Sequence, residues 1–187
     1  MKLPRAALAQ WLSFDKENWT LLGRDTDSLS TELNPDVETT KNVQGDNNTN
    51  HNGFNPETAV DSYAARTEDS IYENLLDIVM NRKSDEESTK AYFLEAVLDE
   101  AVNISDNKTL TGKGWMEEVI VVPQSYGGDT SAFGIPFNLN PKGGERKEGT
   151  VSVTKRVPTF TPAAGGGSQP AAMNETQTKT SSKSLSD

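Results

Sequence analysis

Few residues in this sequence could do chemistry, and their spacing does not favour it. The 187-residue chain has no cysteine and a single histidine, His51, which excludes a multi-histidine metal site and a cysteine nucleophile. A Ser-His-Asp arrangement would have to use His51, which lies in a polar stretch. The adjacent acids Glu117 and Glu118 point to opposite faces of an extended strand, so they do not converge as an acid–base pair. We therefore expect a protein that is not an enzyme and that carries no metal or cofactor.

One stretch has the spacing of calcium ligands. Oxygen-bearing side chains fill the ligand positions of an EF-hand-like loop, namely Asp46, Asn48, Asn50, Asn52 and Glu57. However, His51 stands where the sharp turn of such a loop requires glycine, and no helix precedes it. We interpret residues 44–67 as a long loop without regular structure, which in a compact domain is usually functional or disordered.

Acidic residues are concentrated in the first two thirds of the chain. The formal net charge is −10; residues 1–120 carry 11 Lys and Arg against 23 Asp and Glu, and residues 121–160 carry 5 against 3. Such a surface is unsuited to gripping phosphates, so specific nucleic-acid binding is not expected. No segment approaches a membrane span, and the N-terminus is a poor secretory signal. We expect a soluble protein that is made in a cytoplasm and has no membrane contact.

The elements that would position these residues are mostly strands. The β-branched run at 119–122 is apolar on both faces and predicts a strand buried on both sides. Phe133, Ile135, Phe137 and Leu139 alternate with small or polar residues, which predicts a half-buried strand. Residues 150–154 alternate again after a Gly-rich connection. The pattern predicts a β-hairpin between these last two strands.

The N-terminal part predicts a second hairpin. Residues 19–22, 28–33 and 36–43 are interpreted as strands, with the turn chemistry of Asn34-Pro35-Asp36 joining the last two. Residues 70–83 have the periodicity of an amphipathic helix, with Ser70 and Glu73 spaced as a capping box. Residues 92–98 fit a helix or a strand; we favour strand. Residues 103–114 are interpreted as a polar connector.

Several segments, taken together, carry a resemblance to a known family. These are LSTELNPDVETTKNVQG (29–45), YENLLDIVMNRK (72–83), VVPQSYGGDTSAFGIPFNLN (121–140), EGTVSV (148–153) and VPTFTP (157–162). In order and spacing they resemble the major tail tube proteins of long-tailed, siphovirus-type bacteriophages with Gram-positive hosts. The resemblance covers residues 1–162, which would form the tube domain. Residues 163–187 are rich in Gly, Ser and Thr and are expected to form a flexible C-terminal extension.

The resemblance implies a mainly β fold, an antiparallel β-sandwich or barrel with one flanking helix. It further implies a structural virion protein that forms homohexameric rings, which stack into a tube in the phage tail. Genome DNA would pass through this acidic-walled conduit without specific binding. The implied partners are other copies of the chain and the tape measure, tail terminator and distal tail proteins.

Three groups of residues are candidates for roles in such a tube. We expect Glu32, Asp36 and Glu38 to lie near the lumen, where acidic side chains would repel DNA phosphates; ordinary outer-surface charge is the alternative. The loop at 45–69 is expected to make contacts between stacked rings, through Asp46, Asn50, Phe54, Asp61 and Tyr63. Because Pro136 lacks an N–H, its strand is expected at a sheet edge or at a bulge, so Phe133 and Pro136 are candidates for subunit contact.

Two other functions remain open at this stage. The inner tube of a contractile tail or of a tail-like bacteriocin would have a similar sequence. A carbohydrate- or receptor-binding β-sandwich would be a monomer that uses its Trp and Tyr side chains to stack on sugars.

Overall fold

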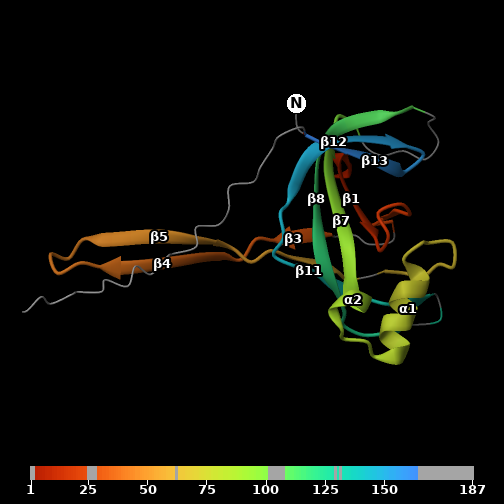
Figure 1. Ribbon diagram of the computed structural model, residues 1–187, viewed down its shortest axis with the longest axis horizontal. Helices are drawn as coiled ribbons and strands as arrows, with labels where there is room; N and C mark the ends of the chain where they lie inside the picture. Colours follow the sequence, from red (N-terminus) through yellow and green to blue (C-terminus); the bar gives the residue numbers. More distant parts are fainter. Residues whose placement is uncertain are drawn as a thin grey trace, which may run out of the picture.

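The chain folds around one large antiparallel sheet that curls into an open half-barrel (Figure 1). The computed structural model describes residues 3–24, 29–61, 63–100, 108–128, 130 and 132–163. The predicted extension at 163–187 lies outside the described residues from 164 onward. The elements in chain order are η1 (Arg5–Ala7), β1 (Leu8–Ser13), β2 (Thr20–Leu21), β3 (Ser30–Glu32), β4 (Pro35–Lys41), β5 (Asn47–Phe54), β6 (Glu57–Val60), α1 (Tyr72–Asn81), α2 (Glu86–Thr89), β7 (Lys90–Leu98), β8 (Leu110–Pro123), β9 (Gly127–Gly128), β10 (Phe133–Gly134), β11 (Phe137–Pro141), β12 (Lys147–Thr154) and β13 (Val157–Pro162).

The large sheet has the strand order β2-β1-β7-β8-β11-β6-β3. Outside this order, β12 pairs with both β8 and β13. β8 is the longest strand. Its second half pairs with β11, its first half pairs with β12, and β7 runs along it on the other side. The large sheet is therefore organised around β7 and β8.

The sheet buries a different face in each half. In the half next to α1, one face carries a core of Leu12, Phe93, Val121, Phe137 and the helix residue Leu75. In the other half the opposite face is covered by β12 and β13, which bury a second core; this core includes Trp11, Leu94, Ala96, Val151 and Val153. Because side chains alternate across a strand, β1 and β7 supply residues to both cores.

Close approach of β12 and β7 to β8 explains two glycines. A Cβ atom on Gly114 would lie 2.1 Å from Val151 Cγ2, and one on Gly112 would lie 2.2 Å from the carbonyl oxygen of Val97. Larger residues at these positions would push the neighbouring strands apart. The start of β8 at Leu110 also corrects the prediction of a polar connector at 103–114, of which residues 103–107 lie outside the described part.

The predicted helix is present, but it is not the only one. α1 runs over Tyr72–Asn81, and the short α2 adds a second helix. The predicted capping box is wrong: Ser70 makes no cap hydrogen bond and instead donates to the carbonyl of Asn18, at 3.0 Å. Residues 92–98 form part of β7, as predicted.

Both predicted hairpins are wrong. β3 pairs with β6, whereas β4 pairs with β5, so the chain passes Asn34 without reversing. β11 pairs with β6 and β8, whereas β12 pairs with β8 and β13, so β11 and β12 lie end to end along β8. In each case the two strands are neighbours in sequence, but other segments provide their hydrogen-bond partners.

Two further expectations need correction. The segment at 44–67, predicted as a structureless loop, contains β5 and β6. The run at 119–122 is not buried on both faces, because Val122 is 39% exposed while Val121 is fully buried. Its outer face is not covered by another layer.

Candidate assembly interface

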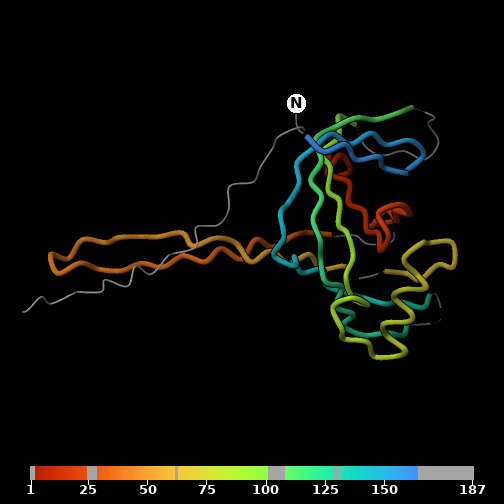
Figure 2. Tube along the Cα trace, in the orientation of Figure 1, coloured from red at the N-terminus to blue at the C-terminus, as the bar shows by residue number. Residues whose placement is uncertain are grey.

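A two-stranded arm extends away from the half-barrel (Figures 1 and 2). β4 and β5 pair only with each other, from Pro35↔Phe54 to Lys41↔Asn47. Every residue of the two strands is exposed except Gly53, which is half-buried. An isolated two-stranded hairpin is marginally stable in water, because it has no face to bury. The arm therefore presents a surface that another layer could cover.

The arm reverses at residues 42–46. The amide of Gly45 donates to the carbonyl of Asn42 at 3.0 Å, and the amide of Asn42 donates to the carbonyl of Asp46 at 3.0 Å. Gly45 has a φ of +90°, which favours glycine. Val43, at this tip, is fully exposed.

The register gives the arm two unlike faces. On one face Pro35 opposes Phe54 and Val37 opposes His51, and the rings of His51 and Phe54 lie 4.6 Å apart. On the other face Asp36 opposes Gly53, and Glu38 opposes Asn50. One face of the arm is therefore apolar at the end that joins the body, and the other face is acidic and rich in amide side chains.

The predicted lumen residues separate into two places. Asp36 and Glu38 lie on the same face of the arm, as their spacing of two along β4 requires. Glu32 lies at the end of β3 and pairs with Glu57 of β6, at the base of the arm. Only Asp36 and Glu38 therefore share a surface.

The predicted inter-ring residues also divide between arm and body. Asp46, Asn50 and Phe54 belong to the arm. Tyr63 is a core residue, and its hydroxyl donates to Asp69 Oδ2 at 3.1 Å. Burial and the negative charge of Asp69 raise the pKa of Tyr63. Asp61 lies at the surface near it.

The two candidates for subunit contact are not on an edge of the large sheet. Phe133 lies in the small ribbon of β9 and β10 and packs partly against the larger core. Pro136 lies between β10 and β11, and its carbonyl accepts the amide of Gln124 at 2.9 Å. The strand that follows, β11, is internal to the sheet. Asp61, Tyr63, Phe133 and Pro136 nevertheless line one open groove together.

A buried polar network was not predicted from the sequence. Glu95 Oε1 accepts a hydrogen bond from Gln10 Nε2 at 2.7 Å, and Glu95 Oε2 is paired with Arg146. Arg146 Nε also lies 3.5 Å from Glu117 Oε1. Burial raises the pKa of Glu117; the charge of Arg146 opposes this rise and the charge of Glu95 adds to it. The sequence gives one signal for this network: Glu95 stands in β7 between the apolar residues Phe93 and Val97, which are two positions away on the same face.

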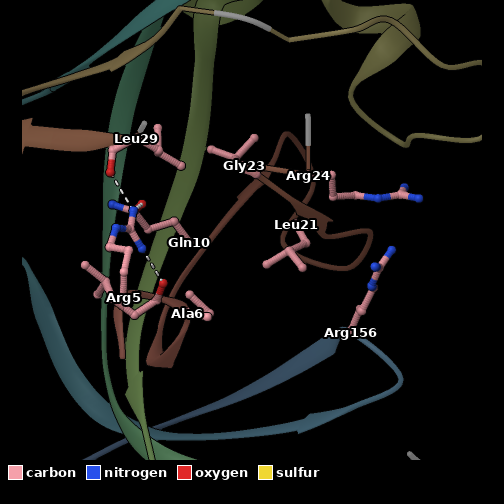
Figure 3. Close-up of a pocket in the computed structure, with 11 residues that line it drawn as sticks. Arg5, Ala6, Gln10, Leu21, Gly23, Arg24, Leu29 and Arg156 are labelled. Carbon is pink, nitrogen blue, oxygen red and sulfur yellow. Dashed lines mark hydrogen bonds between the residues drawn. The ribbon is translucent and has the colours of Figure 1, made fainter. Parts of the chain in front are cut away.

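A recessed site with basic residues lies between β1, β2 and the turn that joins β12 to β13 (Figure 3). Arg5, Arg24 and Arg156 contribute to its lining. Arg5 is fully engaged, since it donates to the carbonyls of Leu8 and Leu29 and to Gln10 Oε1. Arg24 lies 3.6 Å from Asp69.

The described part of the chain lacks two kinds of feature. Its His, Asp and Glu side chains form no group of three that could hold a metal ion. None of its helices combines the length and apolar character needed to cross a bilayer.

No family model matches the sequence, and no curated protein matches it either.

Proposed function

We propose that this protein is a structural subunit that polymerises into the tail tube of a long-tailed bacteriophage. Homohexameric rings stack in this proposal, and genome DNA passes through their lumen without specific binding. The protein then belongs to the virion, acts without catalysis, and meets the tape measure, tail terminator and distal tail proteins. The resemblance of residues 1–162 to tail tube proteins supports the proposal.

The observation that carries the proposal is the arm formed by β4 and β5. It extends from the body with both faces in solvent, and one of these faces carries Pro35, Val37, His51 and Phe54. A hairpin of this kind gains stability when it packs against another surface. A head-to-tail contact of this type between identical chains closes into rings or continues into a filament.

The half-barrel shape of the large sheet is consistent with the same function. A curled antiparallel sheet that does not close on itself can continue into the sheet of a neighbouring copy. Its outer strands β2 and β3 are only two and three residues long. The third outer strand, β13, has six residues but contains Pro158 and Pro162, which have no N–H to donate to a neighbouring strand. We therefore place the main contact on the arm rather than at these edges.

Removal of the arm tests this function directly. We would replace residues 36–53 with an Asn-Gly turn between the paired residues Pro35 and Phe54, because such a turn closes two-residue hairpins. The full chain should form rings or tubes on concentration, seen by negative-stain electron microscopy and light scattering. The shortened chain should stay monomeric, with a circular dichroism spectrum typical of strands and a cooperative thermal unfolding transition like that of the full chain.

Two results would contradict the proposal. The full chain could remain a monomer at every concentration and bind glycans on an array, which would favour the carbohydrate-binding alternative. Alternatively, the shortened chain could assemble as well as the full chain, which would show that the arm is not the contact.

A further inference from the structure

The recessed site in Figure 3 is a cavity of about 400 Å³ with mixed lining. Its apolar part comes mainly from Leu8, Ala9, Leu21 and Leu22. Every charged residue among its described lining residues is an arginine. The cavity therefore suits a ligand that presents one apolar group and one anionic group.

Arg156 is the residue whose hydrogen bonding is incomplete. Its Nε atom is buried, and no hydrogen-bond partner for it lies among the described residues. Burial lowers the pKa of Arg156, and the positive charges of Arg24 and Arg66 lower it further. A buried donor without a partner, beside like charges, is stabilised by an incoming oxyanion.

The backbone at Arg156 has a conformation that is unfavourable for an arginine. Lys155 and Arg156 form the turn between β12 and β13 with φ values of +51° and +73°. Asn and Gly usually fill such positions, and other residues are strained there. The indole nitrogen of Trp11 donates to the carbonyl of Arg156 at 2.9 Å and so holds the turn against the sheet. Strain kept at a side chain that lines a cavity points to a binding role.

The tip of the arm has the matching chemistry. Val43 is fully exposed, and the carboxylate of Asp46 lies within the same turn, where its Oδ2 accepts from Asn42 Nδ2 at 3.2 Å. A flat acidic surface cannot enter a recessed cavity, whereas a projecting turn can. The arm extends away from its own body, so its tip can reach this cavity only in another copy (Figure 2).

We infer that the cavity beside Arg24 and Arg156 receives the arm tip of a second copy, with Asp46 paired to the arginines and Val43 against the apolar lining. This inference depends on the self-assembly proposed above and adds the contact that mediates it. The contact is heterologous, because each copy offers a tip and a cavity at different places. Arginine and carboxylate can form two parallel hydrogen bonds, which would also fix the orientation of the arm.

A charge exchange tests the contact. The variants D46R and R156D should each raise the critical concentration for polymerisation by about tenfold or more, because each leaves a charge unpaired at the contact. The double variant D46R/R156D restores opposite charges and should recover much of the assembly. Light scattering against protein concentration measures the critical concentration, and thermal unfolding of the monomer checks that each variant folds.

Matched controls keep the test specific. K155D changes an exposed charge on the same turn as Arg156, and E87R changes an exposed charge on α2, away from the arm; neither should shift the critical concentration by more than about twofold, as expected for exposed charges. V43S should weaken assembly, because it removes the exposed apolar group from the tip.

The outcomes separate this inference from the proposed function. If deletion of the arm abolishes assembly but D46R and V43S do not affect it, the arm is still the contact and this cavity is not its receptor. If truncation after residue 163 abolishes assembly and D46R does not, assembly depends on the C-terminal segment rather than on the arm tip, and the inference is wrong. The inference would also be overturned if D46R/R156D did not assemble at a lower critical concentration than both single variants.

Discussion

At the residue scale, the carboxylates of Glu95 and Glu117, whose side chains are 11% and 13% exposed, share the partly exposed Arg146. Two acids and one base leave one negative charge in excess, in a place that water reaches poorly. Burial therefore raises the pKa of Glu117 even though Arg146 opposes the shift. The charged form of Glu117 is less favourable in the folded state than in the unfolded state.

This pKa shift gives a prediction for the substitution E117Q. The folded protein binds the proton of Glu117 more tightly than the unfolded chain does. The loss of stability caused by burying the charged carboxylate is therefore complete above the folded-state pKa and absent below the unfolded-state pKa. We expect E117Q to be more stable than the wild type at neutral pH. The difference should shrink toward zero as the pH falls below the ordinary value of 4.5.

Urea unfolding followed by circular dichroism at several pH values measures this difference. E118Q is the control, because the Glu118 side chain is 37% exposed and pairs with Lys90 at the surface; its effect should stay below about 1 kcal/mol. A loss of stability in E117Q at neutral pH would show that the contact with Arg146 outweighs the cost of burial.

At the scale of elements, α1 shows how one face of a helix completes the larger core. Leu75 is fully buried, whereas Met80, on the same helix, is 51% exposed. We expect L75A to lower the free energy of unfolding by about 2–5 kcal/mol, because it leaves a cavity in a packed core. M80A should change it by less than about 0.5 kcal/mol. Chemical denaturation measures both, and equal effects would show that α1 does not pack as described.

The elements that could be predicted are those with an apolar period. The helix at 72–81 is predicted because its apolar residues repeat at helical spacing. Periodicity alone leaves residues 92–98 open between helix and strand, and the resemblance favours the strand that β7 forms. β5 was missed, since a strand with both faces in solvent has no apolar period to detect. The predicted pairing of the strands on either side of residues 34–36 is also wrong. These turn residues lie at the base of the arm, and the chain reverses at 42–46 instead.

The candidate site could be predicted only where it is local in sequence. Asp36 and Glu38 share a face because they are two positions apart on one strand. Arg24 and Arg156, in contrast, lie near opposite ends of the described chain and line one cavity because the turn between β12 and β13 lies against β1. No periodicity in either segment signals that contact.

At the scale of the whole molecule, net charge opposes the association of copies. Each chain carries a formal net charge of −10, and such charges repel one another over a Debye length of about 30 Å at 0.01 M salt and about 8 Å at 0.15 M. We expect the critical concentration for assembly to fall as salt is raised over this range. Ion pairs that become buried on contact are screened less, so they should survive the change.

Light scattering across a series of salt concentrations measures this dependence. A neutral osmolyte at matched osmolarity is the control, because it changes water activity without screening charge. A critical concentration that rises with salt would mean that exposed ion pairs, rather than burial of apolar surface, hold the copies together.

The narrow base of the arm has a mechanical consequence. The arm joins the body where the amide of Asn55 donates to the carbonyls of Leu33 and Asn34, at 3.1 and 3.2 Å. With seven paired positions at about 3.3 Å each, the arm is about 23 Å long, so a tilt of about ten degrees at its base moves the tip by about 4 Å. In the proposed assembly, a filament could bend by small tilts at the bases of the arms while each half-barrel keeps its shape.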